Sequence, residues 1–289
     1  MKIRGWYISA LLVVAGYALA TIDMMDGTPI STNSVIDGIS GVAKFNGQTV
    51  VDWNVQAYQQ GHWKMNDDAA NTTVAGSSFN GNDGTLGGGS NTVDISQDPG
   101  KIGKALLLDG VGDFINIDSV LSDVGSSTSG AFAVWVKPVD VTSDWLSFVT
   151  FNSTNSTRNL ALLQDDGNGH VHAQARGSSQ YKWVFDTDNI VLTNGVWAHI
   201  VLNYNGVEAS LYVDGSLAPT TFSVDNDKAK WFNNLEMHNG RIGSFNDGGG
   251  EGVFFDGQVD DVRIFDRALT TEEIQELYNS GSGTEADSG

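Results

Sequence analysis

Few residues of this chain have the types and spacing that catalysis needs. The 289 residues include no cysteine, so a thiol nucleophile is excluded, and no Gly-x-Ser-x-Gly sequence places a serine at a strand-to-helix turn. No glutamate precedes Glu208. We therefore expect that the protein is not an enzyme.

Two histidines have a spacing that could hold a metal ion. His170 and His172 are two positions apart, so on a strand both side chains would point to the same face. No third histidine or cysteine lies nearby in the sequence. The alternative is two polar residues on the open face of a sheet.

Aromatic residues in the middle of the chain could bind a sugar. Sugars present apolar C–H faces and polar edges, so their sites combine a flat ring with hydrogen-bonding groups. The candidates for such a site are Trp145, Arg158, His170, His172, Tyr181 and Trp183. The alternative for the tryptophans is a place in the hydrophobic core.

The elements that would position these residues are mostly strands. Residues 257–269 alternate in character, with Asp260, Val262 and Ile264 on one expected face and the intervening residues on the other. A short helix over 271–278 should follow, with Thr270 and Glu273 as a capping box.

This closing strand and helix resemble the C-terminal signature of the laminin-G-like, concanavalin A-like jelly-roll domains of secreted bacterial proteins. Three further stretches resemble the family in the right order. They are the opening strand and loop at 62–86, the hairpin at 105–117, and the pair of strands from Trp197 to Tyr204 and from Glu208 to Gly215. The resemblance covers about residues 61–280 and implies an all-β, two-sheet antiparallel jelly-roll sandwich with a short C-terminal helix.

The resemblance also carries expectations about sites. The middle strands of the family build a concave sheet, which would present the candidate sugar-binding residues. Relatives often bind Ca²⁺ through an aspartate at the start of the last strand and carbonyls of an early loop, and Asp260 matches that aspartate. The early loop departs from the family, with Gly76 where aspartate is common and Phe79 where glycine is common. Glycosidases of this sandwich use two glutamates around an aspartate on one strand, an array that this chain lacks.

Composition limits the class of partner. The net charge is −20, and the chain holds 35 glycines and 4 prolines, which suits many tight turns. Such an acidic surface repels phosphate backbones, so we expect no nucleic-acid partner.

The domain organisation follows from the two ends. Residues 1–20 have the charged start, apolar run and Ala18-Leu19-Ala20 of a cleaved signal peptide, or else form a retained N-terminal anchor. Residues 21–60 are a β-rich N-terminal extension with a hairpin signal at Asn46-Gly47, residues 61–280 are the jelly roll, and residues 281–289 are a flexible polar tail.

Together these features predict an exported, non-catalytic carbohydrate-binding or adhesion module that binds calcium. It would be secreted or held at the cell surface, with a glycan or cell-surface polysaccharide as its partner. One alternative is a structural component of a surface layer, filament or virion, which assembles with itself or with a surface partner through residues 21–60. Another is a polysaccharide-active enzyme.

Overall fold

The computed structural model describes strand segments at 8–14, 17–22, 24–25, 28–29, 44–45, 48–49 and 96–97, and residues 58–67, 72–87, 99–143, 145–154, 157–165, 167–246, 248 and 250–284. The chain divides into two compact units, Met1–Trp53 and Asn54–Gly289. The second unit therefore begins seven residues before the boundary expected from sequence.

The described part of the first unit consists of antiparallel strand pairs. β1 (Ile8–Val14) pairs with β2 (Tyr17–Ile22), β3 (Met24–Met25) with β4 (Thr28–Pro29), and β5 (Lys44–Phe45) with β6 (Gln48–Thr49). The predicted Asn46-Gly47 turn lies outside the described residues, but the strands on either side of it pair as a hairpin requires. The predicted cleavage site after Ala20 falls within β2.

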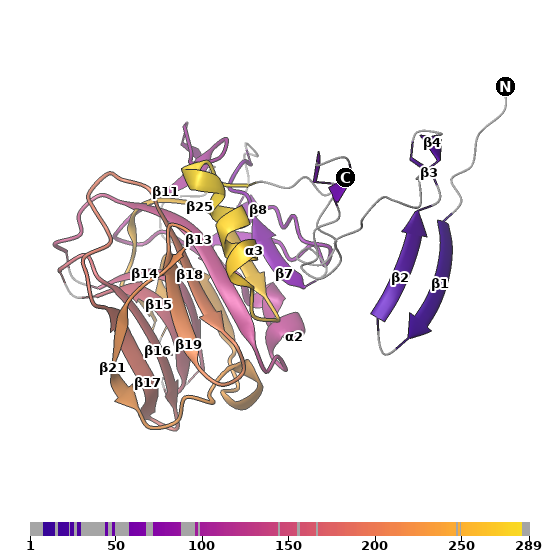
Figure 1. Cartoon of the computed structure of the whole chain (residues 1–289). Helices are drawn as coiled ribbons and strands as arrows, with labels where there is room; N and C mark the ends of the chain where they lie inside the picture. The colour runs from indigo at the N-terminus through magenta and orange to yellow at the C-terminus, as the bar shows by residue number, and fades with distance from the viewer. Residues whose placement is uncertain are drawn as a thin grey trace. The chain divides into compact units, whose positions relative to one another are not determined.

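The second unit is an antiparallel β-sandwich, as the sequence predicts (Figure 1). Its eight-stranded sheet, counted over the described residues, follows the order β10-β11-β25-β13-β18-β19-β20, and β7 pairs with β25 beyond the end of β11. These strands are β7 (Gln59–Trp63), β10 (Ser96–Gln97), β11 (Ala105–Asp109), β13 (Gly130–Pro138), β18 (Ala198–Tyr204), β19 (Ala209–Val213), β20 (Ser216–Leu217) and β25 (Asp256–Phe265).

The nine-stranded sheet of the same residues has the order β21-β17-β16-β15-β14-β22-β12-β9-β8. Its strands are β8 (Thr73–Val74), β9 (Gly84–Gly87), β12 (Phe114–Asn116), β14 (Leu146–Asn152), β15 (Asn159–Gln164), β16 (Val171–Gly177), β17 (Gln180–Thr187), β21 (Thr220–Asp225) and β22 (Asn239–Ile242). A separate hairpin joins β23 (Phe245–Asn246) to β24 (Glu251–Gly252).

The core lies between the two sheets. Phe132 of β13 contacts Phe151 of β14 with ring centroids 5.3 Å apart, and it also packs against Trp231 and Phe232. Trp231 and Phe232 lie in the loop that includes the short helix η2 (Phe232–Asn234). The core therefore anchors a surface loop at one end of the sandwich. Two further short helices, η1 (Asp118–Val120) and α2 (Leu121–Val124), follow β12.

A second, smaller apolar cluster lies on the other side of the eight-stranded sheet. Helix α3 (Thr271–Tyr278) buries Ile274 and Leu277 against Ala131, Ala133 and other residues of that sheet (Figure 1). The predicted capping box is present: Thr270 Oγ1 accepts a hydrogen bond from the Glu273 N–H at 3.2 Å, and the Thr270 N–H donates to the Glu273 carboxylate at 2.8 Å.

The closing strand differs from its expected alternation, and the first residues of the expected tail are packed. A β-bulge in β25, with Asp261 at a left-handed φ of 46°, interrupts the alternation expected for this strand. Val259, Val262 and Ile264 all face the core, whereas Asp260 lies beside Trp135 on the side covered by α3. The tail is also packed as far as it is described: η3 (Asn279–Gly281) follows α3, and Thr284 Oγ1 donates to the Glu276 carbonyl at 2.7 Å.

Candidate functional site

The face of the nine-stranded sheet turned away from the core, called the outer face below, carries a row of polar side chains. On β16, Val171, Ala173 and Ala175 belong to the core, so the alternating residues His172 and Gln174 face outward. A chain of contacts links both residues to β15: His172 Nε2 lies 3.0 Å from Gln174 Oε1, and Gln174 Nε2 donates to Asn159 Oδ1 at 2.8 Å. The outer face therefore carries polar groups that are joined to one another.

Three predicted site residues gather at one end of this face. The half-buried Trp145 ring stands perpendicular to the His172 imidazole, with centroids 4.7 Å apart. His172 Nδ1 lies 2.7 Å from Asp186 Oδ1, and His170 Nδ1 lies 2.5 Å from the Thr187 carbonyl oxygen. The Nδ1 atoms of the two histidines therefore contact different partners, and His170 lies just before β16.

Two other predicted residues lie at the opposite end of the sheet. Arg176 lies four positions after His172 on β16, which corresponds to about 13 Å along the strand. There the Arg176 guanidinium lies over the Tyr181 ring at 5.5 Å, and Arg158 forms an ion pair with Glu236 at 3.1 Å. The six predicted residues therefore do not form one site.

Trp183 requires a correction. Its ring is fully buried and its Nε1–H donates to the Lys230 carbonyl at 3.0 Å, so no sugar can stack on it. The reason is a register shift between β16 and β17: Tyr181 opposes Arg176, and Trp183 opposes the core residue Ala175. Regular alternation would place Tyr181 and Trp183 on the same face of the sheet. The bulge at Lys182 places them on opposite faces.

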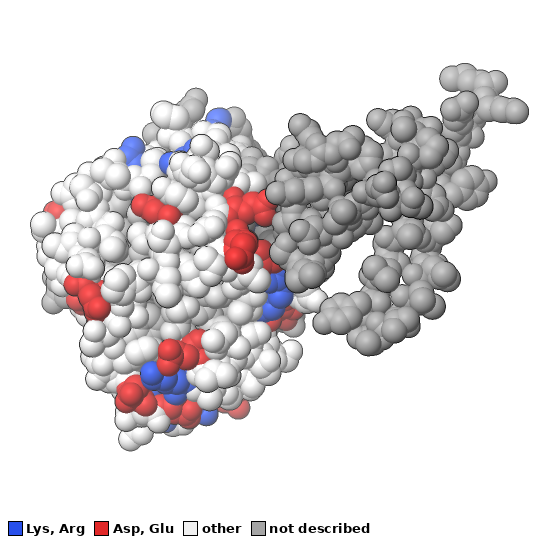
Figure 2. All heavy atoms as spheres, in the orientation of Figure 1, with Lys and Arg blue, Asp and Glu red and all other residues white. Residues whose placement is uncertain are grey.

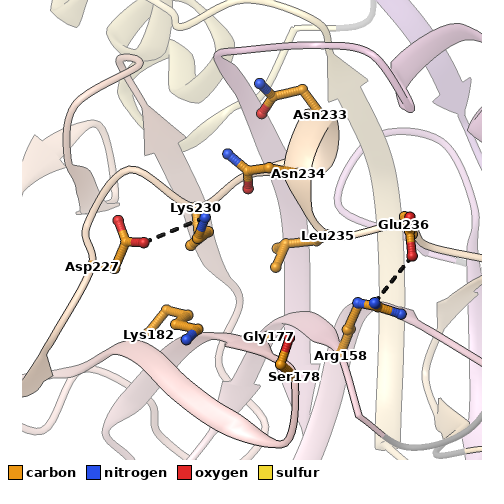
Figure 3. Close-up of a pocket in the computed structure, with 10 residues that line it drawn as sticks. All are labelled: Arg158, Gly177, Ser178, Lys182, Asp227, Lys230, Asn233, Asn234, Leu235 and Glu236. Atoms are coloured by element: carbon orange, nitrogen blue, oxygen red, sulfur yellow. Dashed lines mark ion pairs between the residues drawn. The ribbon is translucent and has the colours of Figure 1, made fainter.

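A pocket of about 320 Å³ opens beside Arg158 and the turn between β16 and β17 (Figure 3). It is lined by Arg158, Gly177, Ser178, Lys182, Asp227, Lys230, Asn233, Asn234, Leu235 and Glu236. Side chains from three separate segments surround the space in Figure 3, with ion pairs joining Arg158 to Glu236 and Lys230 to Asp227. The pocket therefore has charged walls over the buried side chain of Leu235.

The turn at the pocket has an unusual backbone. Ser178 and Ser179 both have positive φ, 53° and 64°, at positions that usually take glycine or asparagine. The Ser179 N–H donates to the Thr157 carbonyl at 2.9 Å, which holds this turn against the neighbouring loop. Strained turns of this kind occur often at binding sites.

Of the residues that line the pocket, only Arg158 was predicted from the sequence. The others come from the turn, from Lys182 on β17 and from the 227–236 loop, and the turn and the loop have no alternating pattern. One local signal did exist: Lys228 and Lys230 are two positions apart in a chain with only 15 lysines and arginines against 35 acidic residues.

Asp260, the expected calcium ligand, is buried beside Trp135 on the side of the sheet that α3 covers. Its Oδ2 accepts a hydrogen bond from the Ile102 N–H at 2.8 Å, and burial raises the pKa of its carboxyl to about 8. Calcium needs several ionised or carbonyl oxygens. Asp260 Oδ1 is buried and has no hydrogen-bond partner among the described residues, which leaves this oxygen available as a ligand.

The neighbouring Asp261 holds a buried charge network. His62 Nε2 lies 2.6 Å from Asp261 Oδ1, and the Arg263 guanidinium contacts both carboxylate oxygens at 3.0–3.2 Å. This guanidinium keeps the pKa of Asp261 low, at about 2, against the effect of burial, while burial lowers the pKa of His62 to about 4. Arg263 also donates to the Thr284 carbonyl, so the network joins β7, β25 and the C-terminal segment.

Residues 109–275 match the family model described as the concanavalin A-like lectin/glucanases superfamily. No curated protein matches the sequence. Among the described residues, no helix has the length and apolar character needed to cross a bilayer.

Several solved structures are similar in fold. The CBM40 of the Ruminococcus gnavus IT-sialidase, bound to α2,3-sialyllactose, has a TM-score of 0.52 at 14% identity, over 59% of this chain and 94% of that one. Domain 4 of AbnA, a GH43 extracellular arabinanase from Geobacillus stearothermophilus in complex with arabinotriose, has a TM-score of 0.55 at 20% identity, over 76% and 98%. The receptor-binding domain of the botulinum neurotoxin C/D mosaic serotype has a TM-score of 0.55 at 15% identity, over 78% and 52%.

Proposed function

The chain belongs to the concanavalin A-like lectin/glucanases superfamily, and from this premise we propose that it is an exported, non-catalytic carbohydrate-binding module. Two structures of similar fold hold sialyllactose and arabinotriose, which supports a glycan as the partner here. The chain lacks a Glu-x-Asp-x-Glu array, which supports a binding rather than a hydrolytic role.

The observation that carries this proposal is the pocket between the β16–β17 turn and the 227–236 loop. Its volume, about 320 Å³, is in the range of small-ligand sites. The Ser178 hydroxyl and the Asn233 amide offer both donors and acceptors, which hydroxyl-rich molecules require. Tyr181, which is exposed and precedes the lining residue Lys182, adds apolar surface for the C–H face of a sugar ring.

The charges of the pocket favour a saccharide that carries a carboxylate. Arg158, Lys182 and Lys230 line the pocket against Asp227 and Glu236, so the local balance is cationic on a chain whose net charge is −20. Arg158 and Lys230 are each paired with one of these acids, whereas Lys182 has no ion pair among the described residues. We infer that Lys182 contacts the carboxylate of the ligand directly.

Calcium remains a prediction of the family resemblance. If Asp260 is a ligand of this ion, a chelator should lower the melting temperature of the wild type and leave that of Asp260→Ala unchanged.

The experiment is a glycan array with the protein that lacks residues 1–20, followed by titration calorimetry with the best ligand. We expect saturable binding, stronger for acidic than for neutral oligosaccharides. Lys182→Ala should weaken the binding of an acidic ligand at least tenfold, because a hydrogen bond to a charged group contributes about 1.5–3 kcal/mol. Lys137→Ala, on β13 of the other sheet, is the control and should bind like the wild type.

The outcomes separate the two parts of the proposal. Binding of neutral glycans alone, with Lys182→Ala unaffected, would remove the acidic preference but keep the module a carbohydrate binder. An array with no saturable ligand at all would contradict the function itself.

A further inference from the structure

Three side chains of types that bind metal ions lie close together at the end of the outer face away from the pocket. Asp165 follows β15, His172 lies on β16 and Asp186 on β17, and one potential ligand atom from each lies within 4.8 Å of the other two. Strand register brings them together, because His172 pairs directly with Asp186, and the Asp165 N–H donates to the His170 carbonyl at 3.0 Å.

One tautomer of His172 leaves Nδ1 available as a ligand. Gln174 Nε2 donates to Asn159 Oδ1, so Gln174 Oε1 is the atom that faces His172 Nε2 at 3.0 Å. A carbonyl oxygen only accepts, so with the Gln174 amide in this orientation Nε2 is the donor. In that neutral tautomer the Nδ1 lone pair points at the Asp186 carboxylate 2.7 Å away.

His172 Nδ1 and Asp186 Oδ1 face each other at 2.7 Å, so a proton or a metal ion lies between them. Asp165 adds a second carboxylate nearby, and Asp186 has no ion pair with lysine or arginine among the residues that the structure describes. A proton on Nδ1 would supply one positive charge, whereas a divalent ion would balance both carboxylates.

We propose that Asp165, His172 and Asp186 form a binding site for one divalent transition-metal ion of the Zn²⁺ type. An imidazole nitrogen with two carboxylate oxygens is a ligand set that Zn²⁺ accepts and that differs from the all-oxygen set of Ca²⁺. The Gln174–Asn159 chain holds the imidazole through its other nitrogen, as partners of metal-binding histidines commonly do. Trp145 packs against the ring and fixes its plane.

Small side-chain movements are enough to admit the ion. Two ligands about 2.0–2.1 Å from a tetrahedral Zn²⁺ lie about 3.3 Å apart, compared with 2.7 Å between His172 Nδ1 and Asp186 Oδ1. The Asp186 side chain is 32% exposed, so it has room to rotate. The predicted partner His170 is not a ligand in this proposal, because its Nδ1 contacts the Thr187 carbonyl.

The test is titration calorimetry of the chelator-treated full chain with ZnCl₂. We expect one ion to bind per chain. Asp186→Asn and His172→Gln should each lower the affinity at least tenfold, since each removes a ligand. Asp188→Asn, which changes an exposed carboxylate just past the end of β17, is the matched control and should bind like the wild type.

Cobalt gives an independent readout of the same site. Co²⁺ bound by the three side chains should show visible absorption that Zn²⁺ abolishes and that Asp165→Asn lacks, with circular dichroism showing that each variant is folded. The proposal is overturned if the wild type binds no Zn²⁺ saturably. It is equally overturned if the folded Asp165 and Asp186 variants bind as well as the control, because the ion would then lie elsewhere on the acidic surface.

Discussion

Tyr181 and Trp183 are two residues apart on β17. One inserted residue between them leaves Tyr181 at the surface and places Trp183 in the core. Tyr181 is 44% exposed beside the pocket, whereas Trp183 is fully buried. Both were predicted to contact a sugar, and only Tyr181 can do so in this structure. The bulge at Lys182 therefore separates a surface role from a core role within a single strand.

This difference gives a matched pair of variants. Trp183→Ala should lower the free energy of unfolding by about 3–5 kcal/mol, because it leaves a cavity in the core. Tyr181→Ala should change stability by less than about 0.5 kcal/mol but weaken glycan binding. Urea unfolding and calorimetry measure the two effects, and a stable Trp183→Ala protein that loses only binding would contradict the assignment.

The buried titratable groups predict how stability depends on pH. The folded-state pKa of His62 is about 4 and that of His199 about 3, both lowered mainly by burial, so each stabilises the fold above pH 6.5 and loses this effect as the pH falls. Burial raises the pKa of Asp260 to about 8, so its contribution is complete below pH 4 and is lost as the pH rises to 8. Below pH 6.5 the stability lost through the two histidines as the pH falls exceeds the stability gained through Asp260. Above pH 6.5 only Asp260 among these three groups changes the stability.

We therefore expect the melting temperature to be highest near pH 6.5 and to decline toward pH 8.5. Asp260→Asn keeps an acceptor for the Ile102 N–H but cannot ionise, so it should abolish the decline on the alkaline side. Thermal melts of both proteins from pH 5 to 8.5 measure this. Parallel curves above pH 6.5 would show that Asp260 is not the group responsible.

At the level of elements, regular alternation was predictable and its interruptions were not. The closing strand, helix α3 with its capping box, and the core strand β13 all follow from local sequence patterns. The bulges at Asp261 and Lys182 depend on pairing with distant strands, which a local pattern does not contain. These two bulges account for the errors at Asp260 and Trp183, and the pocket was missed because it lies in turns and a loop.

Helix α3 offers a test of the second apolar cluster. Ile274 is fully buried against the eight-stranded sheet, so Ile274→Ala should cost about 2–5 kcal/mol of stability. Glu272→Ala, on the exposed side of the same helix, should cost less than about 0.5 kcal/mol. Chemical denaturation of both variants decides the matter, and equal small losses would mean that α3 is not part of the folded core.

For the whole molecule, cationic and acidic side chains are interspersed. Figure 2 shows lysine and arginine at the top, at the right edge and at the lower end of the visible face, and those at the lower end have acidic side chains around them. Lys228 pairs with Glu208, and Lys230 with Asp227. Attraction of an acidic ligand therefore depends on individual side chains such as Lys182 and not on a broad cationic surface.

The proposed export makes a prediction about the N-terminus. If residues 1–20 are a signal peptide, the secreted protein begins at Thr21 and its net charge becomes −22, because Lys2 and Arg4 are removed. Intact-mass measurement of secreted material tests this. A mass that includes Met1, found in the membrane fraction, would support the retained anchor instead.

The place of β25 in its sheet also determines when the protein can finish folding. This strand pairs with β13 on one side and with β7 and β11 on the other, and its Asp261 contacts His62 across 199 positions of sequence. While the ribosome makes the chain, the eight-stranded sheet lacks this central strand until residues 256–265 have been added. Contacts so distant in sequence form slowly. An export signal at residues 1–20 would therefore have the time of synthesis of more than 200 further residues to be recognised before the sandwich can close.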